Sequence, residues 1–271
     1  MTINFANILK ILLVFFLFQL GCKSYNVRPD LTPQERLELA KLMFKNGDYV
    51  DAKIQFRRLT LNNRGLEFSD EAQFFLAECH FYLKEYVLAS DEYNRLVRLY
   101  PHSQWTDDAS FKVGVCNYKL SPKASLDQKY TLLAVQFFQL FLEDYPDSQL
   151  VPDAEKYLKE CRTKLAEKDF KAGKLYLKLN DNKAALVYFD SVLEDYYDTS
   201  FAKDALFWKG EGLYELRRKE EALGAYQQLL TKYPKCKYAG KAKRRVKSIE
   251  EDLKDVREVD GVSSSVKLKK N

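Results

Sequence analysis

Histidine and cysteine are the side chains best suited to metal binding or nucleophilic chemistry, and this chain does not place them in the patterns that such chemistry uses. Neither His80 nor His102 has a Cys, Asp or Ser partner at the spacing of a metal site or a catalytic triad. No CxxC pair and no glycine-rich phosphate loop occur. Carboxylate pairs such as Asp107-Asp108 fall at expected helix starts, where the helix dipole explains them. We therefore expect neither an enzyme nor a bound metal or cofactor.

One cysteine has a predicted chemistry of its own. Residues 1–21 hold a lysine, an apolar run over 11–20 and a glycine directly before Cys22, which is the layout of a signal peptide. Ten apolar residues are too few to span a bilayer. The junction resembles a bacterial lipobox, with Gln19 where Leu is usual, and this resemblance implies a diacylglycerol on Cys22. Ordinary signal cleavage, with Cys22 as an incidental thiol, is the alternative; residues 22–31 would form the tether.

Helical repeats dominate the rest of the chain. Each unit has an alanine followed four residues later by an aromatic, and three units close on a Tyr-Pro pair, with Tyr197 replacing the proline of another. A small residue precedes most of these alanines by twelve positions, as expected where two helices approach closely. The alanines are Ala52, Ala89, Ala134, Ala185 and Ala222, the aromatics Phe56, Tyr93, Phe138, Phe189 and Tyr226, and the small residues Ala40, Ala77, Gly114, Gly173 and Gly210.

This pattern resembles the tetratricopeptide repeat family, which implies stacked helical hairpins. We expect an all-α tetratricopeptide-repeat solenoid of about five hairpins over 32–237, with an insertion near 119–129 in the third unit and a longer helix around 151–169. A charged capping helix over 238–258 and a disordered tail over 259–271 complete the predicted organisation. Cys79 and Cys116 share one register in neighbouring units and are expected to be buried, small apolar residues.

A concave groove is the expected binding surface, because first helices line that face in this repeat family. The positions three before and four or five after each small residue would face the groove, and many are aromatic, which suits an extended peptide. The alternative is that these side chains form the core between repeats. The candidates nominated for a peptide pocket in the first units are Leu37, Phe44, Phe74, Phe81, Tyr82, Phe111 and Tyr118.

The charge distribution suggests a second kind of contact. A formal net charge of +5 is too small to indicate nucleic-acid binding. From Leu230 onward, however, the chain carries 13 Lys and Arg against 6 Asp and Glu. This excess suits an acidic partner or anionic lipid, although a solvated helix face would look the same. The candidate partner contacts are Arg217, Arg218, Lys241, Lys243, Arg244 and Arg245.

A lipobox, a short tether, five hairpins and an insertion that leads into Ala134-Val-Gln-Phe-Phe-Gln-Leu-Phe-Leu-Glu-Asp-Tyr-Pro-Asp-Ser together resemble the BamD family of outer-membrane assembly lipoproteins. The resemblance implies a lipid-anchored protein on the periplasmic face of the outer membrane. It also implies a BamA-like barrel protein and other assembly subunits as partners, with unfolded outer-membrane β-barrel proteins as substrates. Another lipid-anchored scaffold, for cell division or polysaccharide export, is the alternative.

Overall fold

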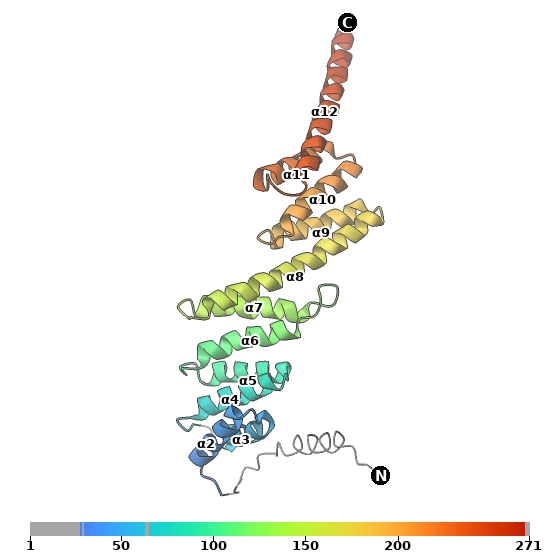
Figure 1. Cartoon of the computed structure of the whole chain (residues 1–271). Coiled ribbons are helices and arrows are strands. Elements are labelled where there is room, and N and C mark those ends of the chain that lie inside the picture. Colours follow the sequence, from blue (N-terminus) through green and yellow to red (C-terminus); the bar gives the residue numbers. More distant parts are fainter. Residues whose placement is uncertain (1–27, 29, 63–64, 269–271) are drawn as a thin grey trace, which may run out of the picture.

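A computed structural model describes residue 28 and residues 30–62 and 65–268, and within them it contains helices and no strand (Figure 1). Most consecutive helices are joined by short turns. Each helix has an apolar stripe that packs against a neighbouring helix. The helices are α2 (Pro33–Lys45), α3 (Tyr49–Asn62), α4 (Ser69–Tyr82), α5 (Tyr86–Leu99), α6 (Thr106–Leu120), α7 (Lys129–Asp144), α8 (Val151–Lys178), α9 (Asn182–Asp195), α10 (Ala202–Glu215), α11 (Lys219–Lys232) and α12 (Ala239–Leu268).

Consecutive helices pair into five hairpins that stack in chain order, as Figure 1 shows from α2 at one end to α11 near the other. We number these hairpins 1 to 5, from α2–α3 to α10–α11. Helix α12 packs on α11 and then projects from the end of the stack. The predicted tetratricopeptide solenoid of about five hairpins with a C-terminal helix is thus confirmed.

Hairpins 3, 4 and 5 are each closed by an aromatic ring that lies directly on the glycine of the partner helix. A Cβ built on Gly114 would lie 2.6 Å from Phe138, and one on Gly210 would lie 2.6 Å from Tyr226. Phe138 and Tyr226 are completely buried, as are the aromatics of the other three hairpins. The small residue therefore makes room for a ring as well as for a close approach of backbones.

The turns inside hairpins 1, 2, 4 and 5 share one geometry. In hairpin 2, Lys84 has a φ of 61°, and its N–H donates to the carbonyl of Phe81 while the N–H of Glu85 donates to that of His80. This pair of bonds is a Schellman motif, which ends a helix sharply. Hairpin 3 has an eight-residue loop, 121–128, in place of this turn. The other left-handed residues at this position are Gly47, Asn180 and Arg217.

Helix α8 is the first helix of hairpin 4, and it also packs on hairpin 3. Its first half buries Ala154 and Cys161 against hairpin 3, and its second half packs Phe170 and Leu177 into the core of hairpin 4. The extra length predicted around 151–169 is therefore part of one continuous helix of 28 residues that runs to Lys178. This helix connects the two halves of the stack without a turn (Figure 1).

The two ends of the chain compare differently with the sequence predictions. The predicted signal peptide, Cys22 and most of the 22–31 tether lie outside the described residues. Helix α2 begins at a capping box, in which Thr32 accepts from the Glu35 N–H and Glu35 accepts from the Thr32 N–H. At the other end, α12 runs to Leu268 and so exceeds the predicted capping helix over 238–258. None of the described helices is long and apolar enough to cross a membrane.

The ring-on-glycine contact predicts opposite outcomes for two glycines in neighbouring helices. Gly210→Ala places a methyl group against the buried Tyr226 ring and should lower the free energy of unfolding by about 1–3 kcal/mol. Gly224→Ala meets no atom within 4 Å on the exposed side of α11 and should raise it by about 1 kcal/mol through helix propensity. Urea unfolding followed by circular dichroism measures both values, and equal effects would contradict the packing account.

Candidate functional site

An aromatic pocket of about 430 Å³ opens where hairpins 2 and 3 meet the start of α8. Its walls are aromatic and aliphatic, three lysines stand among them, and the lining contains no carboxylate. These properties suit a ligand with an apolar body and a negative group. The residues that line this aromatic pocket are Phe81, Tyr82, Lys84, Tyr86, Phe111, Lys112, Val115, Lys119 and Tyr157.

Ring contacts fix the aromatic walls. The centroids of Phe81 and Tyr86 are 5.5 Å apart, and those of Phe111 and Tyr157 are 6.1 Å apart. Tyr82 stacks on Tyr49 of hairpin 1, with centroids 4.7 Å apart and ring planes within 8°. Tyr82 is nevertheless 49% exposed, so this stacked ring offers a pre-positioned contact surface to a ligand.

The three lysines of the pocket differ in how free their charge is. Lys112 lies 3.0 Å from Glu78 and 4.4 Å above the Phe81 ring, so its charge is already used within the structure. The buried Glu78 also accepts a hydrogen bond from Tyr93. Within the described part of the chain, Lys84 and Lys119 form no ion pair. These two ammonium groups are therefore the ones available to a ligand carboxylate.

The structure brings only some of the seven predicted groove residues together. Phe81, Tyr82 and Phe111 line the aromatic pocket, and Phe44 extends it because its ring contacts Tyr82 edge-on at 5.6 Å. Phe111 is only 7% exposed, so it forms the floor rather than a free contact. Four of the seven predicted residues therefore lie in or beside the aromatic pocket, and their role in peptide binding stays a prediction.

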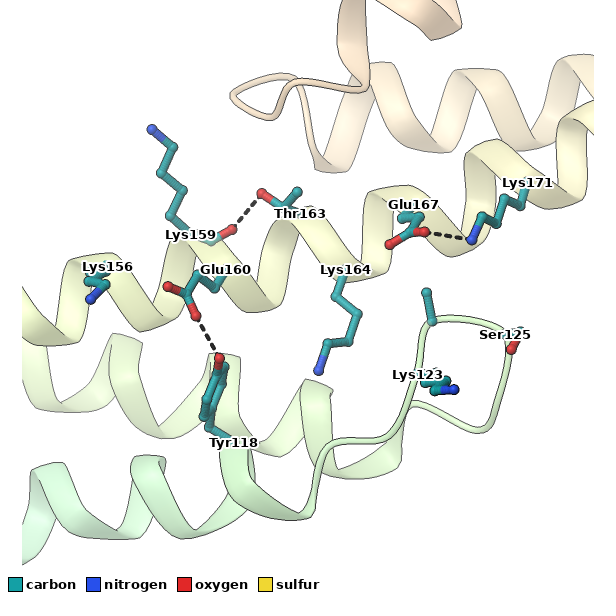
Figure 2. Close-up of a pocket in the computed structure, with 11 residues that line it drawn as sticks. Tyr118, Lys123, Ser125, Lys156, Lys159, Glu160, Thr163, Lys164, Glu167 and Lys171 are labelled. Carbon is teal, nitrogen blue, oxygen red and sulfur yellow. Dashed lines mark hydrogen bonds and ion pairs between the residues drawn. The ribbon is translucent and has the colours of Figure 1, made fainter.

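The other three predicted residues are placed elsewhere. Leu37 is 2% exposed in the core of hairpin 1, and Phe74 is buried with its ring stacked on Trp105 at 4.5 Å. Both lie three residues before a small residue, on the same helix face as that residue, which is the face that packs. Tyr118 faces a separate groove beside α8, where its hydroxyl donates to Glu160 at 2.6 Å (Figure 2).

Sequence reasoning missed several residues of the pocket. Lys119 is five residues after Gly114, the same register as Tyr82 after Ala77, but the predicted groove residues are all aromatic or leucine. Lys84 occupies the left-handed position of the turn in hairpin 2. The spacing of the repeats could have indicated this turn position. Tyr157 reaches the pocket from α8, and only the packing of α8 on α6 reveals it.

Two of the predicted basic partner contacts are used inside the protein. Lys241 and Arg245 of α12 lie 2.7 and 3.0 Å from Glu211 of α10, and Tyr226 donates to the same carboxylate. Burial raises the pKa of Glu211, but the hydrogen bonds from Arg245, Lys241 and Tyr226 outweigh it and leave the pKa below its usual value. This cluster holds α12 on the last hairpin.

The other four predicted contacts remain at the surface. Arg218 pairs with Glu221 at 2.6 Å, one turn along the same helix. Arg217 occupies a left-handed turn, and Lys243 and Arg244 are exposed on α12. Arg217, Lys243 and Arg244 are consequently the members of the predicted set that a partner can reach.

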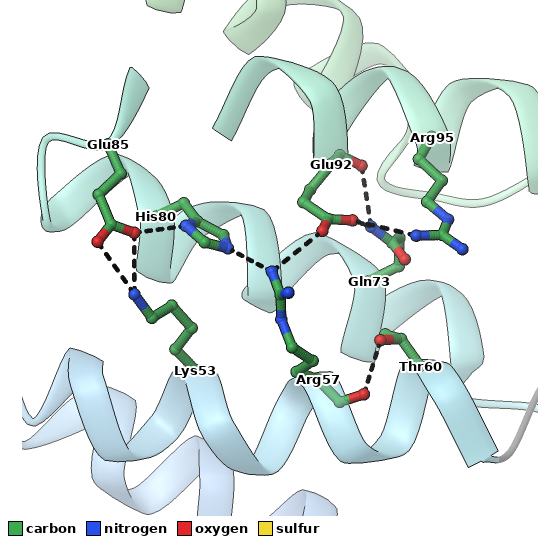
Figure 3. Close-up of polar contacts among 8 residues, drawn as sticks. All are labelled: Lys53, Arg57, Thr60, Gln73, His80, Glu85, Glu92 and Arg95. Atoms are coloured by element: carbon green, nitrogen blue, oxygen red, sulfur yellow. Dashed lines mark hydrogen bonds and ion pairs between the residues drawn. The ribbon is translucent and has the colours of Figure 1, made fainter. Parts of the chain in front are cut away.

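A polar network joins α3, α4 and α5 beside the turn that carries Lys84 (Figure 3). His80 is buried, with Nδ1 2.6 Å from Glu85 and Nε2 3.1 Å from an Arg57 nitrogen. Arginine can only donate, so Nε2 accepts and the proton lies on Nδ1, which donates to Glu85. Lys53 also pairs with Glu85 at 2.9 Å. His80 therefore has a structural position at the turn that carries Lys84.

The described part of the chain contains no metal-ligand cluster and no paired cysteines. No group of three or more His, Cys, Asp or Glu side chains there could hold a metal ion. Cys79, Cys116 and Cys161 are buried and unpaired, and burial raises the pKa of the first two thiols to about 12. Cys79 and Cys116 are thus the buried apolar residues that their register predicted.

Comparison with known proteins identifies the family. The family model described as "YfiO: Outer membrane lipoprotein" matches residues 29–222. The chain belongs to this family. A curated relative, "Outer membrane protein assembly factor BamD" of Rickettsia prowazekii (strain Madrid E), is 28% identical over 122 residues, which cover 45% of this chain. The match spans about half the length of that relative, at 49%. The resemblance to BamD proteins seen in the sequence is confirmed at the level of the family.

Solved structures similar to this YfiO-family chain are other tetratricopeptide proteins. The TPR2AB domain of yeast Sti1, solved as a complex with pHSP90, gives a TM-score of 0.41 at 15% identity, covering 82% of this chain and 84% of that one. A tetratricopeptide repeat protein from Parabacteroides merdae gives 0.40 at 16% identity, with 82% and 86% covered.

The buried histidine makes the stability of hairpin 2 depend on pH. Burial, assisted by the charges of Lys53 and Arg57, holds the pKa of His80 below its usual value despite the hydrogen bond to Glu85. The unfolded chain therefore takes up this proton first, near about pH 6.5, and stability is lost as the pH falls below that value. We expect the urea midpoint to fall from about pH 7.5 to 5.5, and His80→Gln to flatten this slope. His102→Gln, in an exposed turn, is the control; an unchanged slope in the His80 variant would contradict the assignment.

Proposed function

We propose that this protein is a lipid-anchored subunit of the outer-membrane β-barrel assembly machinery. In this proposal Cys22 carries the lipid, the repeats lie on the periplasmic face of the outer membrane, and the chain binds a BamA-like barrel protein while receiving unfolded barrel proteins for insertion. Support comes from the outer membrane lipoprotein family and from the relative named as an assembly factor. The proposed role is scaffolding and recognition, without catalysis.

The aromatic pocket is the observation that carries the substrate half of this proposal. The carboxyl-terminal strands of barrel proteins that BamD-like proteins are thought to receive end in an aromatic residue. Such an end combines a ring with a free carboxylate. Tyr82, Phe81 and Phe111 supply a surface for the ring, and Lys84 and Lys119 supply unpaired positive charges at the rim. The volume of about 430 Å³ suits one or two side chains rather than a folded domain.

The partner half of the proposal rests on the C-terminal end of the stack. The BamD resemblance assigns BamA binding to the C-terminal repeats, where Arg217, Lys243 and Arg244 are exposed. The cluster around Glu211 holds α12 against hairpin 5, so these side chains are presented by a fixed surface. Substrate and partner would therefore bind at separate places along one elongated molecule, the substrate near its middle and the partner at its C-terminal end (Figure 1).

Tyr82→Ala should weaken binding of a fluorescein-labelled ten-residue peptide of alternating apolar and polar residues ending in Phe. Loss of a central, half-exposed aromatic contact is expected to raise Kd about tenfold. The matched control is Tyr197→Ala, which removes a tyrosine that is at least as accessible, 66% exposed, far along the stack. Fluorescence anisotropy gives both constants, with circular dichroism to show that helical content is unchanged. Equal affinities for the two variants would remove the pocket from the proposal.

The lysines of the pocket generate a separate prediction about the peptide end. Amidating the peptide carboxylate should weaken binding to the wild-type protein several-fold, because a charge-assisted contact contributes about 1 kcal/mol or more. The double variant Lys84→Gln/Lys119→Gln should bind both peptides alike. A wild-type protein that ignores amidation would show that the carboxylate is not recognised.

Affinity capture from detergent-solubilised outer membrane distinguishes the proposed role from the alternative scaffold roles. Recovery of a BamA-like barrel protein is expected, and recovery of division or export proteins alone would favour the alternative.

Mass spectrometry of the mature amino terminus tests the anchor independently. A diacylglycerol-modified Cys22 is expected, and an unmodified thiol at Cys22 would contradict the lipoprotein assignment.

A further inference from the structure

A second cavity, of about 840 Å³, lies between α8 and the 121–128 loop that replaces the turn of hairpin 3 (Figure 2). We call it the lysine groove. The α8 residues that line it lie between positions 156 and 171 at helical spacing, so they form one face of that helix. On the side that faces α8, Tyr118 and the buried Ala124 provide an apolar surface. The insertion singled out in the sequence therefore builds one wall of this groove.

Hydrogen bonds hold the loop in this shape. The buried side chain of Gln128 donates to the carbonyls of Lys123 and Leu126 at 2.9 and 3.0 Å, and its oxygen accepts from Thr131 at 2.6 Å. Ser121 contacts Thr131 at 2.5 Å and accepts from the Lys164 ammonium of α8 at 2.7 Å. These bonds close the loop on itself and tie it to α8, so the groove is formed before any ligand arrives.

The charge of the groove is strongly one-sided. Five lysines line it, namely Lys123, Lys156, Lys159, Lys164 and Lys171, against two glutamates. Both glutamates already have partners, since Tyr118 donates to Glu160 and Lys171 pairs with Glu167 at 2.5 Å. Within the described residues, Lys123, Lys156 and Lys159 form no ion pair. Positive charge thus remains unneutralised along the length of the groove.

We propose that the lysine groove docks an extended, acidic segment of a partner protein. Its α8 wall runs over 15 residue steps, or about 22 Å, which matches about six or seven residues of extended chain. A single phosphate prefers several donors converging on one point. Here the lysines are spread along a line, and an alternation of Asp or Glu with small residues would meet them in sequence while its backbone crosses Tyr118 and Ala124.

The shape of the groove favours a protein segment over a bilayer. A membrane surface is broad and contacts charges spread over a protruding face, whereas these lysines follow one face of α8 and the loop beside it. Tyr118 faces this groove while the aromatic pocket is lined by other residues, so the two sites have different walls. This docking site goes beyond the proposed receipt of barrel proteins and does not depend on it.

A labelled peptide of eight residues, alternating Glu and Ser, tests the proposal by fluorescence anisotropy at low salt. The wild-type protein should bind it, and Lys123→Gln/Lys156→Gln/Lys159→Gln should weaken binding about tenfold, as three exposed charges without an ion-pair partner are lost. The control Lys168→Gln/Lys178→Gln/Lys232→Gln removes the same charge from positions outside the groove, two of them on α8. Equal loss in both variants would overturn the proposal, because it would show that only net charge matters.

A variant that changes the loop without changing charge provides the second test. Gln128→Leu removes the hydrogen bonds to Lys123 and Leu126 and should weaken the Glu-Ser peptide several-fold while leaving the Phe-ended peptide of the aromatic pocket unaffected. A matched Gln-Ser peptide should not bind.

Vesicles of 30% phosphatidylglycerol in phosphatidylcholine test the lipid alternative by cosedimentation. Vesicle binding that depends on the three groove lysines, without binding of the acidic peptide, would overturn the proposal in favour of a membrane contact.

Discussion

The contact between a buried aromatic ring and a small residue on the facing helix is the constraint on which this molecule depends. Phe138 against Gly114, Phe189 against Gly173 and Tyr226 against Gly210 leave no room for an added methyl group. Because the ring and the small residue sit at fixed positions in their helices, each contact sets the register of its hairpin. A hairpin cannot cover its own apolar face, so the fixed registers are what let neighbours stack into a continuous core.

The aromatic pocket and the lysine groove are both consequences of that stacking. The aromatic pocket forms where hairpins 2 and 3 meet α8, so its walls come from four helices that only the registers bring together. The lysine groove exists because hairpin 3 carries a loop in place of the sharp turn of its neighbours, and because α8 continues through two units. The regular parts of the repeat thus supply the frame, and its two irregular parts, the loop and the long helix, supply distinctive surface.

The sequence predicted the hairpins because the alanine and aromatic positions report directly on packing between neighbouring helices. It was less successful with the groove, because a helical position three before the small residue shares the packed face. Leu37 and Phe74 are buried for that reason, while Tyr82, five residues after Ala77, turns outward. Lys84, Lys119 and Tyr157 could not be grouped from spacing alone, since their proximity depends on how α8 crosses the hairpins. The roles of Lys241 and Arg245 were likewise invisible until Glu211 was seen between them.

We propose that the aromatic pocket receives the carboxyl-terminal end of an unfolded barrel protein. Site-specific photocrosslinking tests it most directly, with the photoreactive amino acid p-benzoylphenylalanine in place of Tyr82, in place of Tyr197, or in place of neither, and an unfolded barrel protein added. We expect a crosslink at position 82 that mass spectrometry maps to the last few residues of the substrate, with little at position 197. Crosslinks of equal yield at both positions, or a crosslink at 82 that maps throughout the substrate, would contradict the claim.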